Sequence, residues 1–280
     1  TYAPTTVISA SGVSGMAASY QQSILPSNAS AALLTASPAN LYEAQISAKV
    51  GNRIQRSKRV TYGYRSIRFD KDTGFYLNGI HTKLKGVCVH HDGGCIGAAE
   101  NRSAIERQVD ILTNMGCNAI RLTHNPFGAE YLDVCQRKGV LLVEELFDCW
   151  TKSKKQKDFG RYFTDHYAEV VTSTIHRDWN NPAVIMWSLG NESGIGCNQN
   201  KMAEYLHSRN RHNLVHCEDI SRRNADRLHG DMKGKSDGEI GGALRSPHID
   251  VESRMYPSPE EIQATYLDRT VFDKPLFLCE

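Results

Sequence analysis

Two glutamates close apolar runs and are the residues of this 280-residue chain best suited to chemistry. Glu192 ends the stretch that begins at Val184, and Glu280 ends the stretch that begins at Pro275. A carboxylate at the end of a buried strand is partly desolvated, which raises its pKa and suits a general acid. Two facing carboxylates about 5–5.5 Å apart can hydrolyse a glycosidic bond, one attacking the anomeric carbon and the other protonating the leaving oxygen. Placement alone fits a solvated strand-end Glu192 and a frayed chain end at Glu280 equally well.

Short apolar strands alternate with amphipathic helices through the part of the chain that carries these glutamates. Seven strands are predicted, at Leu84–Val89, Asn118–Leu122, Val140–Glu144, Val184–Leu189, Leu214–Cys217, Ile249–Tyr256 and Leu276–Cys279. Helices are predicted from a capping box at Ser103–Glu106, over Ala129–Lys138, Asp165–Trp179 and Asn198–Arg209, and after a cap at Ser258. This alternation predicts an α/β fold with a parallel sheet.

Polar residues follow the carboxyl ends of most predicted strands, and this placement favours a barrel. They are His90-His91-Asp92, His124-Asn125, Glu144-Glu145, Asn191-Glu192, Glu218-Asp219, Tyr256 and Glu280. A (β/α)8 TIM barrel has its active site on that face. A doubly wound sheet usually carries a glycine-rich phosphate loop, and the sequence has none. We therefore expect an incomplete TIM barrel of about seven strands.

Residues 1–70 have a different pattern, without helical periodicity. Residues 41–50 alternate as a half-buried antiparallel strand, and Gly51-Asn52 offers a turn. A second strand is predicted over Arg59–Phe69, with a bulge near Arg65. The expected organisation is a small β-sandwich over residues 1–70 followed by a barrel domain over residues 71–280. The uncharged first 40 residues and the abrupt end after an apolar run lead us to expect a piece of a longer protein.

Composition excludes several classes of protein. Lys and Arg total 33 against 31 Asp and Glu, a net charge of +2 that does not favour a nucleic-acid or acidic-membrane partner. No apolar run approaches the roughly 18 residues of a membrane span. Eight cysteines without a C-x-x-C pair favour buried thiols in a reducing compartment over a disulfide framework.

Several motifs together resemble glycoside hydrolase family 2, the β-galactosidase, β-glucuronidase and β-mannosidase group. They are GFYLNG, KLKGVCVHHD, MGCNAIRLTHNP, WSLGNES, SRMYPSPEEI and KPLFLCE, and the likeness extends over residues 40–280. The resemblance implies a retaining exo-β-glycosidase, β-galactosidase-like, that uses a two-carboxylate double displacement. It also implies an immunoglobulin-like sandwich before the barrel.

The same resemblance implies a role for each motif residue. Glu192 corresponds to the acid/base and Glu280 to the nucleophile. Asn191 corresponds to the partner of the sugar 2-hydroxyl, and Tyr256 to the phenol that hydrogen-bonds the nucleophile. Such a phenol would keep the Glu280 carboxylate ionised, and so separate its pKa from that of Glu192 as the two roles require.

Five further residues are predicted to bind or shape the substrate. Arg121 and His124 resemble the family's buried arginine near the nucleophile and its substrate-pocket histidine. By its position alone, a strand-end histidine is more often structural. His90 is expected to contact sugar, and Asp148 and Trp150 to shape the sugar pocket.

A metal-dependent TIM-barrel hydrolase is an alternative suggested by the sequence His90-His91-Asp92. Adjacent strand residues point to opposite faces, however, so both histidines reach one ion only if the strand has already ended. The best-known β-galactosidases of the family carry a Glu and a His after the third strand as magnesium ligands, whereas this chain has Cys149 and Thr151 in that stretch, which suit a hard cation poorly. We expect neither a catalytic metal nor a cofactor.

The function predicted from the sequence is thus hydrolysis of a terminal β-linked sugar. A catalytically silent chain that at most binds carbohydrate is a second hypothesis, because an open barrel exposes two sheet edges. The expected partner is a carbohydrate substrate, without nucleic acid or membrane, and a homo-oligomer is left open. A bacterial cytoplasm or periplasm is the expected location.

Overall fold

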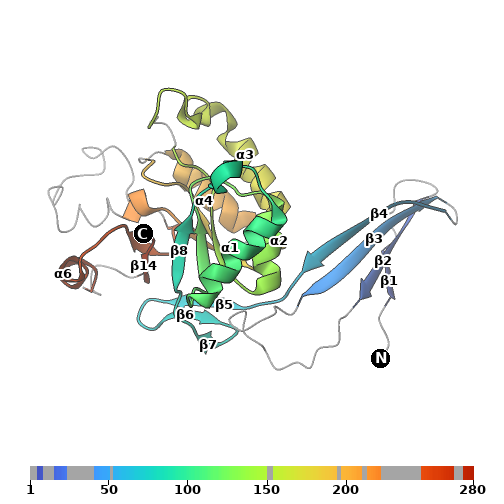
Figure 1. The fold of residues 1–280 in the computed structure, drawn as a ribbon, viewed down its shortest axis with the longest axis horizontal. Coiled ribbons are helices and arrows are strands. Elements are labelled where there is room, and N and C mark those ends of the chain that lie inside the picture. The colour runs from blue at the N-terminus through green and yellow to red at the C-terminus, as the bar shows by residue number, and fades with distance from the viewer. Residues whose placement is uncertain are drawn as a thin grey trace.

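The computed structural model describes nine segments of the chain. They are residues 5–8, 16–23, 41–50, 53–149, 154–193, 197–209, 213–221, 247–267 and 274–280. An extended antiparallel sheet carries the N-terminal strands, and an α/β body carries the remainder (Figure 1). None of the helices in the described segments is long and apolar enough to cross a membrane.

The N-terminal strands form one antiparallel sheet in chain order. Its members are β1 (Thr5–Ile8), β2 (Met16–Ser23), β3 (Tyr42–Val50) and β4 (Arg53–Tyr62). The strand predicted over residues 41–50 is confirmed as β3, while Gly51-Asn52 lies outside the described residues. The sandwich itself, with a second layer, stays a prediction.

The predicted bulge near Arg65 is wrong, because the chain leaves one sheet there and enters another. β4 ends at Tyr62 and β5 (Ile67–Asp70) begins the next sheet. Between them, the half-buried Arg65 guanidinium donates to the carbonyl oxygens of Pro182 (2.5 Å) and Val184 and to Asn213 Oδ1 (2.6 Å). The segment is therefore attached to the barrel rather than to a neighbouring strand.

A small sheet closes the amino-terminal end of the barrel. β5 pairs with β6 (Gly74–Leu77), which pairs with β7 (Ile80–His81). Phe75 and Leu77 of β6 are buried and pack in one apolar cluster with barrel residues that include Leu141 and Val143. This sheet spans the predicted boundary between residues 70 and 71, and the division into two domains stays a prediction.

In the described segments, seven parallel strands form the barrel wall, as predicted, with ends that differ by at most three residues from those expected. Five are hydrogen-bonded in the order β12-β11-β10-β9-β8, and two more pair as β13-β14. Their bounds are β8 (Gly86–Val89), β9 (Ala119–Leu122), β10 (Leu141–Glu145), β11 (Val184–Ser188), β12 (Leu214–His216), β13 (Glu252–Arg254) and β14 (Leu276–Leu278). Asp250 continues the wall from β12 to β13, because its amide donates to Val215 O at 2.9 Å.

The longer helices cover the outside of strands β8 to β12, while the short helix after β13 lies apart from them, beyond β14 (Figure 1). The helices are α1 (Arg102–Asn114), α2 (Ala129–Lys138), α3 (Phe163–Asp178), α4 (Cys197–Arg209) and the short α6 (Pro259–Glu261), with single turns η1 (Gly94–Ile96) and η2 (Phe159–Arg161) and the π-helical η3 (Ile262–Tyr266). Ser258 caps α6 as predicted, accepting from Glu261 N at 3.1 Å.

The predicted capping box at Ser103 is wrong by two positions. Asn101 is the N-cap of α1, with extended backbone, and its Oδ1 accepts from Ala104 N at 3.2 Å. An Asn side chain caps a helix amino terminus as well as Ser does, by accepting from the amide three residues further on. Glu106 instead pairs with Arg102 at 3.0 Å, so its side chain does not form the predicted capping box with Ser103.

Candidate active site

Arg121 lies at the centre of the carboxyl-terminal face of the barrel. It is the third residue of β9, only 4% exposed, and its side chain reaches three acidic or amide groups from other strands. Its Nη2 donates to Glu145 Oε2 at 2.7 Å and to Asn191 Oδ1 at 3.2 Å, and its Nη1 donates to Glu280 Oε1. Burial lowers the pKa of Arg121, but the charge of Glu145 together with smaller contributions from Cys279 and Cys88 outweighs it, so the pKa is raised.

Glu280 is held by donors on both carboxylate oxygens. Tyr256 donates its phenolic hydrogen to Oε2, and Arg121 donates to Oε1, where His124 Nε2 also lies 3.9 Å away. Partial burial raises the pKa of Glu280, yet the Tyr256 hydrogen bond and the Arg121 charge together bring it below the ordinary glutamate value. Glu280 is therefore an ionised carboxylate at neutral pH.

Tyr256 connects the two predicted catalytic glutamates electrostatically. The ring is 76% exposed at the mouth of the barrel, on a backbone with φ of 53°. The hydrogen bond to Glu280 and its charge raise the pKa of Tyr256 to about 12, with a smaller contribution from the charge of Glu192. Both carboxylates thus lie close enough to this phenol for their charges to raise its pKa.

Glu192 and Asn191 follow β11 at the same mouth. Glu192 is exposed, with φ of 43°, whereas the sequence predicts a partly desolvated carboxylate. Asn191 is buried, and because its Oδ1 accepts from Arg121, the amide Nδ2 is the group left to donate elsewhere. Within the described residues this Nδ2 has no hydrogen-bond partner.

Glu145 is a central site residue that the sequence analysis does not single out. It is fully buried at the end of β10. Its carboxylate accepts hydrogen bonds from Arg121, from Ser188 Oγ at 2.6 Å and from His124 Nδ1 at 2.6 Å. The signal was present in Glu144-Glu145, because alternation places one of two adjacent glutamates inside the barrel. The other, Glu144, lies outside the strand wall next to Asp178 and Arg177.

Cys88 is a second residue that sequence reasoning missed. This thiol, on β8, lies 3.9 Å from Glu280 Oε1 and 3.6 Å from Arg121 Nη1, and its Sγ contacts Cys279 O at 3.5 Å. Burial raises its pKa, so it is a neutral thiol beside the carboxylate. All seven cysteines with described surroundings are free thiols.

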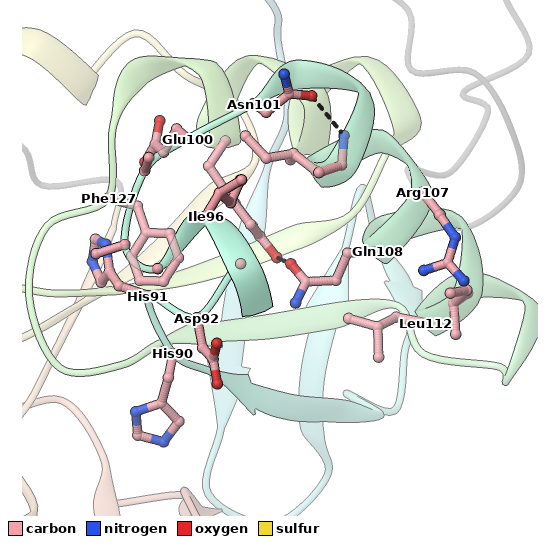
Figure 2. A pocket seen from close by; sticks show the side chains of 18 residues that line it. His90, His91, Asp92, Ile96, Glu100, Asn101, Arg107, Gln108, Leu112 and Phe127 are labelled. Carbon is pink, nitrogen blue, oxygen red and sulfur yellow. Dashed lines mark hydrogen bonds between the residues drawn. The ribbon is translucent and has the colours of Figure 1, made fainter.

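The three residues after β8 separate toward two sides of the barrel rim. The His90 ring meets the His124 ring edge-on, with centroids 5.2 Å apart. The His91 ring points the other way and packs against the Phe127 ring, with centroids 3.8 Å apart and planes tilted by 38°. It lies in a surface cavity of about 280 Å³ that His90, Asp92 and α1 also line (Figure 2). In the described part of the chain, no group of three His, Cys, Asp or Glu residues is placed to hold a metal ion.

The remaining predicted substrate residues are less central. Asp148 pairs with Lys154 at 2.8 Å on the loop after β10, and both are partly exposed. Trp150 lies outside the described residues. The structure therefore brings Arg121, His124, Asn191, Tyr256 and Glu280 together by direct contacts, and leaves Asp148 at the edge.

A family model decides the classification of this chain. The model described as "Glycosyl hydrolases family 2, TIM barrel domain" matches residues 70–280. The chain belongs to glycosyl hydrolase family 2. It is accordingly a glycoside hydrolase sequence, and the predicted TIM barrel is confirmed, with seven of its strands in the described segments.

Family 2 relatives extend this finding. The beta-galactosidase BoGH2A of Bacteroides ovatus is 50% identical over 130 residues, which is 46% of this chain and 15% of that protein. A putative beta-glucuronidase of Formosa agariphila is 39% identical over 155 residues, 55% of this chain and 15% of that protein. A solved beta-glycosidase from Bacteroides vulgatus has a TM-score of 0.63 at 34% identity, over 65% of this chain and 24% of its own. The chain thus spans less than a quarter of the length of these three relatives.

Proposed function

We propose that this chain carries the active site of a retaining exo-β-glycosidase, in which Glu280 is the nucleophile and Glu192 the acid/base. The observation that supports this most directly is the environment of Glu280. Donors from Tyr256 and Arg121 on its two oxygens keep the carboxylate ionised and fixed in orientation. A nucleophile in such a reaction must be unprotonated when the substrate arrives.

The first step forms a covalent glycosyl-enzyme. A Glu280 oxygen attacks the anomeric carbon while the bond from that carbon to the leaving oxygen breaks, and protonated Glu192 gives its proton to this oxygen. The exposure of Glu192 at the barrel mouth suits proton exchange with incoming water. As Glu280 loses its negative charge in the ester, Arg121 remains paired with Glu145 and so is not left as an unpaired buried cation.

The second step reverses these roles. Glu192, now a carboxylate, takes a proton from a water molecule whose oxygen attacks the anomeric carbon, and the ester bond to Glu280 breaks. The product has the anomeric configuration of the substrate, because two inversions have occurred. Tyr256 again donates to the released Glu280 carboxylate and stabilises it as it leaves.

Three polar groups are proposed to bind the sugar. The Asn191 Nδ2 amide would donate to the 2-hydroxyl, a contact that strengthens as the oxocarbenium-like state develops. The His124 and His90 rings contact each other beside the proposed nucleophile, with His124 Nε2 3.9 Å from Glu280 Oε1, and would bind further sugar hydroxyls. We propose a β-galactosidase-like specificity, since the relative with 50% identity is named a beta-galactosidase, although others are named beta-glucuronidases.

A mechanism-based label tests the assignment. The full-length protein is incubated with 2-deoxy-2-fluoro-β-galactoside and β-glucuronide reagents that carry a good leaving group, and then digested and mapped by mass spectrometry. We expect the label on the peptide that contains Glu280, and none in a Glu280→Gln variant. A label on any other residue would overturn the assignment of the nucleophile. Binding of sugar without turnover of any aryl β-glycoside would favour the catalytically silent alternative.

A further inference from the structure

A line of hydrogen-bonded polar side chains crosses the barrel interior behind the site. Ser253 of β13, His216 of β12, Ser188 of β11 and Glu145 of β10 are each fully buried. His216 Nε2 lies 2.8 Å from Ser253 Oγ, and its Nδ1 lies 2.9 Å from Ser188 Oγ. Ser188 Oγ in turn lies 2.6 Å from Glu145 Oε2. Four adjacent strands therefore contribute one member each.

The chemistry of these groups determines the direction of every bond. Glu145 is ion-paired with Arg121, so it accepts hydrogen bonds and donates none, and the Ser188 hydroxyl must donate to it. The Ser188 oxygen then needs a donor from the other side, which only a protonated His216 Nδ1 supplies. Burial, and to a smaller degree the positive charge of Arg121, lower the pKa of His216 to about 3, so the ring is neutral. A neutral ring protonated at Nδ1 has a bare Nε2, to which Ser253 donates.

Donors from every side therefore converge on Glu145. Ser188 and Arg121 donate to Oε2, and His124 Nδ1 donates to Oε1 at 2.6 Å. The Arg121 guanidinium donates to both Glu145 and Glu280. Its hydrogen bond to one carboxylate therefore depends on how many other donors the other carboxylate already has. Removing the Ser188 donor would draw Arg121 toward Glu145 and away from Glu280.

We propose that His216 is a positioning residue, whose Nδ1-protonated tautomer aims the Ser188 hydroxyl at Glu145 and thereby keeps Arg121 on the Glu280 nucleophile. The proposal deepens the proposed function and rests on Glu280 being the nucleophile. The groups that face His216 are Ser188, Ser253 and the Phe277 ring, whose centroid lies 5.5 Å from that of His216. The positive charge of Arg121 also acts on His216. The groups that face Glu280 are Cys88, Arg121, His124 and Tyr256.

The first experiment reads the tautomer directly and needs no substrate. Full-length protein with 15N-labelled histidine is compared with a His216→Asn variant, which assigns the His216 signals. We expect Nδ1 in the range of a protonated imidazole nitrogen and Nε2 in the range of an unprotonated one, unchanged between pH 5 and pH 9. An Nε2-protonated ring, or a ring that titrates in this interval, would overturn the proposal. Either result is independent of whether the protein hydrolyses glycosides.

The second experiment tests the connection to Glu280 with matched variants. Ser188→Ala removes the donor to Glu145, whereas Ser188→Thr keeps the hydroxyl. His216→Leu removes the donor to Ser188, whereas His216→Asn keeps an N–H near the Nδ1 position. We expect the Ala and Leu variants to lose about tenfold in kcat/KM, as for a lost hydrogen bond to a charged group. The acid limb of their profile of kcat/KM against pH should move to higher pH, because the pKa of Glu280 would rise when Arg121 stabilises its carboxylate less. The Thr and Asn variants should keep most of the activity and the original limb.

An unchanged acid limb in folded Ser188→Ala or His216→Leu protein would contradict the proposal, even if the overall activity fell. Folding is checked by thermal unfolding of each variant. If a His216 variant does not fold, the Ser188 pair and the tautomer of the unmodified protein still decide the question. Labelling of Glu280 by the fluoro-sugar together with a wrong His216 tautomer would leave the proposed function in place and remove only this inference.

Discussion

Arg121 and Glu145 form a buried ion pair across neighbouring strands of the barrel, with Nη2 and Oε2 2.7 Å apart and side chains 3% and 0% exposed. The same guanidinium also donates to Glu280, which is partly exposed at the barrel mouth. A permanent interior partner means that Arg121 does not depend on the reacting carboxylate for charge balance. The same arginine therefore stabilises the barrel interior, through Glu145, and the ionised form of the proposed nucleophile Glu280.

Loss of Glu145 should destabilise the protein strongly. Glu145→Ala leaves Arg121 buried without its interior partner and also removes the acceptor of Ser188 and His124. Breaking one half of a buried pair typically costs about 3–5 kcal/mol. Urea unfolding should show this loss, while Glu106→Ala at the exposed pair with Arg102 should change the free energy of unfolding by about 0.5 kcal/mol or less. Equal effects of the two variants would show that Glu145 is not part of a stabilising network.

Removal of the Tyr256 hydroxyl should affect catalysis without affecting folding. Tyr256→Phe takes away a donor that lowers the pKa of Glu280, so that pKa should rise and the acid limb of kcat/KM should move to higher pH. We expect a loss of about ten- to a hundredfold in kcat/KM at neutral pH, as for a hydrogen bond to a charged group. Because the ring is 76% exposed, the melting temperature should stay unchanged. A profile identical to that of the unmodified enzyme would argue against Glu280 as the nucleophile.

The proposed acid/base role of Glu192 should appear as a dependence of the hydrolysis rate on the leaving group. Glu192→Ala should slow hydrolysis of alkyl β-glycosides by about 10²–10⁴-fold, because their leaving oxygen needs a proton. Activated nitrophenyl glycosides should be cleaved in the first step at a rate closer to normal, with the glycosyl-enzyme then accumulating. Added azide, which needs no general base, should restore turnover of the activated substrate and give a β-glycosyl azide. Uniform loss for all leaving groups would remove Glu192 from this role.

Glu144 should make the free energy of unfolding fall as pH rises. Burial, and then the neighbouring Asp178 carboxylate, raise the pKa of Glu144 well above its ordinary value, although Arg177 opposes the shift. The folded protein therefore binds a proton more tightly than the unfolded chain, whose glutamate pKa is about 4.3. The stabilisation is fully present below that pH and is lost as pH rises through the folded pKa.

Glu144→Gln tests this dependence, because the amide cannot ionise. The variant should lose less stability than the unmodified protein between pH 5 and pH 8 in urea titrations. Glu106→Gln, on the exposed face of α1, serves as the matched control and should leave the dependence unchanged. Parallel pH profiles for Glu144→Gln and the unmodified protein would contradict the assignment of a protonated Glu144.

Local sequence patterns were sufficient for the strand and helix order of the barrel. Each strand is a short apolar run, and the helices have their own start and stop signals, so neither needs distant contacts to be recognised. Helix Ala129–Lys138 was predicted to the residue. The errors fell where two local signals compete, such as Asn101 against Ser103 as the cap of α1, or where a tertiary contact intervenes. Arg65 is such a case, since its partners Pro182 and Asn213 are more than 100 positions away.

The sequence by itself determined the family, the parallel strands and the two carboxylates that follow two of them, because these depend on runs of neighbouring residues. Only the tertiary structure decided which of Glu144 and Glu145 points inward, and that Cys88 touches Glu280. It also decided that Ser188, His216 and Ser253 form one directed line, because three strands contribute one residue each. Such contacts depend on strand register and barrel curvature, which no local pattern encodes.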